Sequence, residues 1–212
     1  MNHLLVCALV TLGLALPAHA KKETKKAAAP VSTALKLDTA KSQIDWVGKK
    51  VLVDSKHMGN LKLKSGEVTF DKGQLTAGQF VIDMTTINST DMEGKPKKAD
   101  LEGHLKNADF FDVAKYPTAT FKITSVKPLP NPAAGQPTHE VTGDLTLKDK
   151  TNAITFPAQV TSKEGVTEAL ANLKIDRTLW DVRYASDKFF KGLGDKVIAN
   201  DIDLTLKLVA TK

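Results

Sequence analysis

Apolar and polar residues alternate along most of the chain after Leu35. The alternation is strictest near the C-terminus, where Ile202, Leu204, Leu206 and Leu208 are separated by polar side chains. The same period of two recurs in the ranges 44–46, 61–63, 68–70, 80–84, 119–123, 141–147, 154–160 and 169–175. This period buries one face of a β-strand and leaves the other in water, which is typical of antiparallel sheet. The pattern therefore predicts about eight or nine strands.

Short polar clusters that end in glycine separate several of these ranges, at Lys64-Ser65-Gly66, Asp71-Lys72-Gly73 and Lys163-Glu164-Gly165. Glycine adopts the positive φ angles that tight turns require, so we predict a turn at each cluster. The proline-rich range 128–137 is interpreted as a surface loop, because proline cannot donate a hydrogen bond to a neighbouring strand.

Only residues 97–111 break the period of two. Leu101, Leu105 and Ala108 are spaced as on one face of a helix, and we predict a short helix that ends near Asp109. The sequence shows no internal repeat and no second domain boundary. The described pattern therefore indicates a single all-β domain with one short helix.

Strands with one buried face can pack as a sandwich or close as a barrel. A barrel removes the unpaired edges that an open sheet of this size would expose. With about eight strands, the interior of a barrel is either filled by side chains or holds one small ligand. The inward positions mix small and large apolar residues, and this mixture fits both interiors.

The N-terminus has the organisation of a secretory signal. An apolar run over residues 4–16 precedes Pro17 and the triplet Ala18-His19-Ala20, and we interpret residues 1–20 as a cleaved signal peptide. The alternative is a buried N-terminal helix. Residues 21–34 are interpreted as a flexible leader rich in lysine and alanine, and residues 35–212 as the barrel domain. Cleavage of this signal peptide would leave a mature protein without cysteine, because Cys7 lies inside the signal.

The formal net charge is +6, and the range 21–26 supplies half of it. Transient contact with an anionic membrane is one expectation for this segment, and a solvated leader is the alternative. We expect no nucleic-acid partner, because Arg177 and Arg183 are the only arginines and no motif combines basic with aromatic residues.

The sequence has no motif for catalysis or for a metal. It lacks a nucleophile elbow, a phosphate-binding glycine loop and a zinc-protease helix, so we predict that the protein is not an enzyme. His57, His104 and His139 share no ligand spacing, and we predict no metal site and no cofactor.

Residues 108–121 resemble the signature of the YceI-like family, in which His-Leu precedes Asp-Phe-Phe-Asp and then Tyr-Pro. His104-Leu105 stands just ahead of this range, and further matches occur at 141–151, 175–178 and 194–197. The chain departs from the family pattern at Leu101-Glu102, where many members carry Arg-Asp, and at Asp149, where glycine is common.

The resemblance runs from about Leu37 to Ala210. It implies a lipocalin-like, extended antiparallel barrel whose apolar pore holds a polyisoprenoid, an isoprenoid quinone or a fatty-acyl lipid. It also implies a periplasmic or secreted protein, and some members of the family form homodimers. The alternative function is a ligand-free envelope or protein-interaction module whose barrel is filled by side chains.

Inward-facing apolar residues of the alternating ranges are the candidates for the pocket wall, although each also fits an ordinary core. These candidates are Trp46, Phe80, Ile82, Met84, Phe121, Ile123, Leu145, Phe156 and Leu173. Arg177 follows Leu173 on the same face, near a strand end. We consider two roles for Arg177: it binds a phosphate or quinone oxygen, or it pairs with Asp176, Asp181 or Asp195.

The pair Phe189-Phe190 lies in a loop flanked by lysine and glycine. We interpret it either as a lid or membrane-docking tip, or as a pair of rings packed against the end of the barrel.

Overall fold

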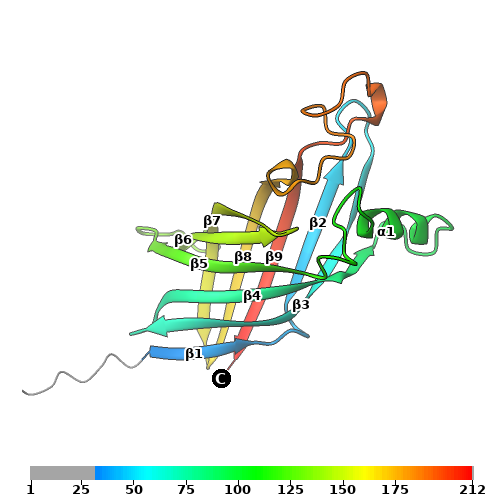
Figure 1. Cartoon of the computed structure of the whole chain (residues 1–212). Coiled ribbons are helices and arrows are strands. Elements are labelled where there is room, and N and C mark those ends of the chain that lie inside the picture. The colour runs from blue at the N-terminus through cyan, green and yellow to red at the C-terminus, as the bar shows by residue number, and fades with distance from the viewer. Residues whose placement is uncertain (1–31, 212) are drawn as a thin grey trace, which may run out of the picture.

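The computed structural model describes residues 32–211 and shows a closed antiparallel β-barrel with one α-helix (Figure 1). The strands are β1 (Ser32–Leu37), β2 (Gln43–Lys49), β3 (Lys56–Asp71), β4 (Gln74–Ser89), β5 (Thr118–Pro128), β6 (His139–Leu147), β7 (Lys150–Lys163), β8 (Val166–Asp176) and β9 (Asp201–Thr211). The helix is α1 (Lys98–Lys106), and two short 3-10 helices are η1 (Arg177–Trp180) and η2 (Gly194–Lys196). The predicted all-β barrel with one short helix is confirmed.

The predicted signal peptide and residues 21–31 of the predicted leader lie outside the described residues. Residues 32–34 form the start of β1, so the predicted boundary between leader and barrel at residue 35 is three residues too late. No helix within residues 32–211 is long and apolar enough to span a membrane.

Eight positions around the barrel are filled by nine strands. The order runs β3-β2-β9-β8-β7-β6-β5-β4, and β4 pairs with β3 again to close the ring. β1 and β2 follow one another in the same gap between β3 and β9, with β1 at the lower end in Figure 1 and β2 above it. The Ser42 hydroxyl bridges the break between them, because Oγ accepts from Val209 N (2.9 Å).

Tight turns join the long strands and fix their register. Two-residue turns with positive φ at both positions connect β3 to β4 at Lys72-Gly73, and β7 to β8 at Glu164-Gly165. These are the hairpin turns whose twist matches that of the strands. The turn at Lys148-Asp149 between β6 and β7 is of the same kind, and Asp149 adopts a φ of 61°. Aspartate tolerates this conformation, so the departure from the family's glycine affects only the turn.

The turn predicted at Lys64-Ser65-Gly66 is wrong. These residues lie inside β3, where the register with β4 shifts between Leu63 and Ser65. A Cβ at Gly66 would lie 2.6 Å from Leu37 Cδ1, so the glycine permits close packing beside a β-bulge.

Helix α1 is shorter than predicted, because it ends at Lys106 and Asn107 is already extended. Ala108 is exposed and takes no part in the apolar face. The helix is attached to the end of β4, where Ser89 N donates to Glu102 Oε1 (2.8 Å). Leu105 and Phe111 then pack against the barrel core.

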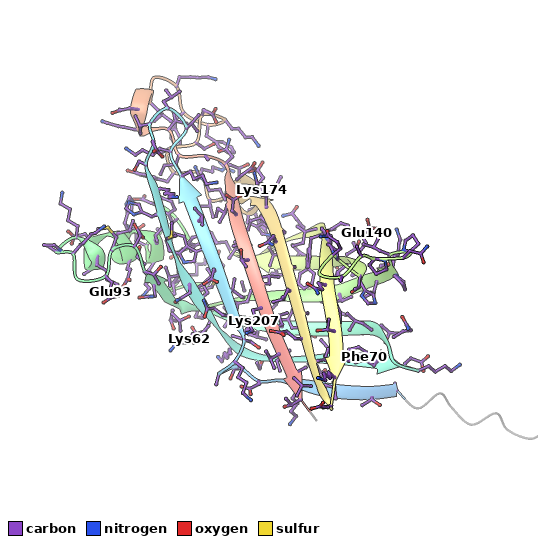
Figure 2. The ribbon with its side chains drawn as sticks, turned by 180° about the vertical axis from the view of Figure 1, so that it is seen from behind. Lys62, Phe70, Glu93, Glu140, Lys174 and Lys207 are labelled. Carbon is purple, nitrogen blue, oxygen red and sulfur yellow. The ribbon has the colours of Figure 1, made fainter. Side chains whose placement is uncertain are left out.

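The alternating residues take the faces that the sequence predicts. Figure 2 views the barrel from behind, with Lys174 and Lys207 marking the exposed side of β8 and β9. Their neighbours Ile175 and Leu208 are buried in the core. The barrel wall therefore separates a polar exterior from an apolar interior.

Candidate functional site: an apolar cavity in the barrel

The upper half of the barrel encloses a cavity of about 210 Å³, which we call the upper cavity. Its lining reaches the exposed side chains of Lys49, Lys50 and Lys56, so the cavity opens at this end of the barrel. Below this mouth the wall is apolar. Its members include Ile44, Leu61, Ile87, Leu147, Ile175 and Leu204.

A second, lower cavity of about 50 Å³ lies toward the C-terminal end of β9. Three phenylalanine rings stand at the boundary between the cavities. Phe121 stacks on Phe80 with ring centroids 5.9 Å apart, and contacts Phe156 at 5.7 Å. The Phe121 ring lies against Gly143 and would clash with any larger residue, since a Cβ at position 143 would lie 2.3 Å from Phe121 Cζ. The interior is therefore partly empty above the rings and nearly filled below them.

The ten predicted ligand-binding residues divide between these spaces. Trp46, Ile82, Met84, Leu145 and Arg177 line the upper cavity. Phe80, Phe121, Ile123 and Phe156 line the lower cavity. Leu173 packs against the core and belongs to neither lining. The binding role of each residue stays a prediction.

Four lining residues come from α1 and the segment after it, and sequence reasoning missed them as wall residues. They are Leu101, Leu105, Phe110 and Phe111. The helical spacing of the two leucines was visible in the sequence. Nothing in that spacing shows which element the helix covers, because its placement depends on the end of β4.

Arg177 is buried and lies where β8 passes into η1. Its guanidinium donates to three backbone carbonyls: Nε to Ala199 (3.0 Å), one terminal nitrogen to Val182 (2.7 Å) and the other to Ile198 (3.1 Å). Burial lowers the pKa of Arg177. These bonds attach the loop after η1 to the barrel.

The carboxylate partners predicted for Arg177 are wrong. Asp176 pairs with Lys188, and Asp181 pairs with Arg183. Asp195 lies in η2 and is exposed. The start of η1 turns the guanidinium toward the carbonyls of the following loop instead, and these carbonyls give no signal in the sequence.

Two loops form the mouth, and we call residues 50–55 and 185–199 the rim loops. They are joined by backbone hydrogen bonds, with Val51 N donating to Val197 O (3.0 Å) and Ala199 N to Lys49 O (2.8 Å). Figure 1 shows them together at one end of the barrel. Both loops are therefore fixed to each other and to β2.

The rim loops expose apolar side chains at their tips. Leu52 is 66% exposed and Phe190 is 48% exposed, and Val51, Val53 and Phe189 are exposed as well. Of the two interpretations of the phenylalanine pair, the one in which both rings are buried against the barrel end is therefore wrong. The exposed rings fit the other interpretation, a lid or a docking tip.

His57 lies at the mouth, where its Nδ1 is 2.9 Å from Asp91 Oδ2. Burial alone would raise the pKa of Asp91, but hydrogen bonds from Met58 N and His57 outweigh it and lower the pKa. His104 instead contacts the rings of Phe110 and Tyr184. Within residues 32–211, no three histidine or carboxylate side chains gather as metal ligands would.

Comparison with known proteins agrees with this architecture. Residues 35–210 match the YceI-like domain. A UPF0312 protein of Pseudomonas putida W619 is 35% identical over 127 residues, which cover 56% of this chain and 61% of the relative. Protein YceI of Escherichia coli O157:H7 is 36% identical over 102 residues, which cover 48% of each chain. The chain thus spans less than two thirds of these curated relatives.

Solved structures share the fold over most of the chain. Burkholderia cenocepacia BcnA is 25% identical with a TM-score of 0.61, covering 82% of this chain and 99% of BcnA. A polyisoprenoid binding domain from Saccharophagus degradans is 16% identical with a TM-score of 0.57, covering 84% of this chain and 97% of that domain. The match to the domain profile spans nearly the whole described barrel. The resemblance seen in the sequence is confirmed: the chain belongs to the YceI-like domain family.

Proposed function

We propose that the barrel binds a long apolar lipid in the upper cavity and carries or sequesters it. Candidate ligands are a polyisoprenoid, an isoprenoid quinone or a fatty-acyl chain. The observation that carries this proposal is the apolar cavity that opens at the rim loops. The shared fold with a domain described as polyisoprenoid binding supports it.

The size of the upper cavity suits a hydrocarbon segment. About 10–15 Å³ on this measure holds one water, so the cavity of about 210 Å³ takes roughly 14–21 groups of that size. Burying one methylene contributes about 0.8 kcal/mol, which gives a gross gain on the order of 10 kcal/mol. This exceeds the lower estimates of the cost of association. Burial of the hydrocarbon alone can therefore give useful affinity, without a specific polar contact.

The direct test is native mass spectrometry of freshly purified protein, followed by organic extraction. We expect a bound mass that dissociates as a lipid. Protein that carries no lipid and takes up no fluorescent isoprenoid would instead support the ligand-free envelope module. Fractionation of the producing cell tests the proposed periplasmic location.

Ala119 offers a way to fill the cavity from within. It is buried on β5 and lines the upper cavity. Ala119→Phe should weaken lipid binding by at least about tenfold, because the ring takes the space of several methylenes. The matched control is Ala153→Phe on the exposed face of β7, which should leave affinity unchanged in a fluorescent displacement assay. Equal affinity for both variants would place the ligand elsewhere.

We further propose that ligand exchanges with a membrane at the rim loops. Their exposed tips adjoin the mouth, so a docked barrel would receive a lipid without passing it through water. Leu52→Asp combined with Phe190→Asp should slow lipid transfer between vesicles at least about tenfold, because each apolar side chain contributes about 1.5–3 kcal/mol when buried and about 1.4 kcal/mol corresponds to tenfold. Leu170→Asp, at an exposed position on β8 away from the mouth, is the control. Equal rates for the two proteins would remove the docking role.

A further inference from the structure

The rim loops and the residues that flank them are basic. Residues 49–56 and 185–199 contain six lysines and three aspartates, a formal charge of +3. Residues 32–211 as a whole contain 25 basic and 23 acidic residues, a formal charge of +2. The barrel away from the mouth is therefore slightly acidic, and the positive charge is concentrated at the end where the upper cavity opens.

Most of the lysines at the mouth are available to a partner. Two of the six are paired within the barrel, Lys49 with Asp203 and Lys188 with Asp176. The other four are exposed and form no ion pair with any residue in the range 32–211. These four are Lys50, Lys56, Lys191 and Lys196. Their charge is therefore open to a group of opposite sign.

The apolar tips among these lysines are held in place. Ser186 O accepts hydrogen bonds from Phe189 N (3.1 Å) and from Phe190 N (3.0 Å). The guanidinium carbon of Arg183 lies 4.7 Å from the centre of the Phe189 ring. The two rim loops are also bonded to each other through Val51 N and Val197 O. A surface that is already ordered loses little conformational entropy on binding.

This combination of side chains fits the boundary between water and a lipid bilayer. Apolar tips enter the acyl region, while lysine stems lie along it and keep their ammonium groups at the level of the head groups. A globular acidic protein would need a matching apolar pocket for each exposed tip, such as Leu52 and Phe190. A bilayer needs no such match, so it is the occupant that the surface fits best.

Building on the exchange of ligand at the rim loops, we propose that the rim recognises an anionic bilayer and docks on it with the mouth facing the lipid. The lysines supply the preference for anionic head groups, and the apolar tips supply the insertion. Stable attachment to a membrane generally takes two such signals. The same surface repels the acidic remainder of the barrel, so the uneven charge also orients the molecule before contact.

Flotation of the purified protein with vesicles tests this preference. Vesicles of phosphatidylcholine are compared with vesicles of equal parts phosphatidylcholine and phosphatidylglycerol. The protein should bind the anionic vesicles more tightly, and added salt should weaken that binding. Lys191→Gln combined with Lys196→Gln should weaken it at least about tenfold, because each cation near such a surface strengthens binding about fivefold. Binding of the same variant to the neutral vesicles should not change.

The matched control removes two exposed lysines away from the mouth. It combines Lys72→Gln, in the turn between β3 and β4, with Lys122→Gln on the outer face of β5. The control changes the net charge by the same amount and should keep nearly full binding. The lysine-rich range 21–26 is identical in both variants, so its own attraction to the vesicles cancels in the comparison.

Equal losses in the two double variants, or full binding by the rim variant, would overturn the inference. Equal binding of the unaltered protein to both kinds of vesicle would overturn it as well. Absence of binding to either kind would do the same and would indicate an acidic protein as the partner. Neither Lys191 nor Lys196 lines the upper cavity, so uptake of a fluorescent isoprenoid should be unchanged in the rim variant. Failure of the unaltered protein to take up the isoprenoid would instead refute the proposed function.

Discussion

Arg177→Met is expected to destabilise the barrel by about 3–5 kcal/mol, because one buried and two partly buried backbone carbonyls would lose their partner together. Domains of this kind have only about 5–15 kcal/mol of total stability, so the loss is a large fraction of it. The methionine side chain keeps most of the apolar stem that lines the cavity. Urea unfolding at equilibrium measures the change, and hydrogen exchange should show the loop from Val182 to Ala199 opening first.

Arg183→Met is the matched control for this variant. Arg183 is exposed, pairs with Asp181 and lies over the ring of Phe189. Exposed pairs contribute about 0–1 kcal/mol, so the control should stay near the unaltered protein. A similar small effect at Arg177 would show that the loop is held by other contacts.

Phe121→Ala is expected to join the two cavities into one longer pore. Removing a buried phenylalanine costs about 3–5 kcal/mol, and here the stacking on Phe80 and the tilted contact with Phe156 are lost as well. The enlarged space should favour longer chains, so affinity should rise along a series of prenols of increasing length. Bound lipid should in turn restore part of the lost stability, since ligand binds only the folded barrel.

Phe70→Ala separates the opening of the boundary from a simple loss of volume. Phe70 lines the lower cavity and takes part in none of the phenylalanine contacts at the boundary. The Phe70→Ala substitution should destabilise the protein without changing the length of lipid chain that it prefers, as measured by native mass spectrometry. The same length preference in both variants would show that the three rings do not limit the pore.

The strands and the closed barrel could be predicted from the sequence because a period of two fixes which face of each strand is buried. The misinterpreted cluster at Ser65-Gly66 shows the limit of turn signals, since the same glycine that permits a turn also permits a bulge. The division of the interior could not be predicted. Ala119 and Phe121 are neighbouring inward positions on β5, yet they line different cavities. That difference depends on how rings from three strands meet.

The hydrogen-bonding roles of individual side chains were harder to predict than which residues face the barrel interior. The sequence indicated that Arg177 faces inward, but its partners are backbone carbonyls, which every residue has. The sequence indicates Trp46 as an apolar wall residue, but it does not show that the indole N–H has no acceptor within residues 32–211. Side-chain type predicts burial well, whereas hydrogen-bond partners depend on the tertiary structure.

The division of one barrel position between β1 and β2 lets the two cavities take this part of their walls from strands with separate registers. A strand that slips by one residue exchanges its inner and outer faces. A slip in β1 would turn Leu35 and Leu37 away from the lower interior, yet it would leave Trp46 in place because β2 sets its own register beyond Ser42. Insertions or deletions near Ser42 can thus change the β1 side of the lower cavity while the β2 side of the upper cavity keeps its alignment.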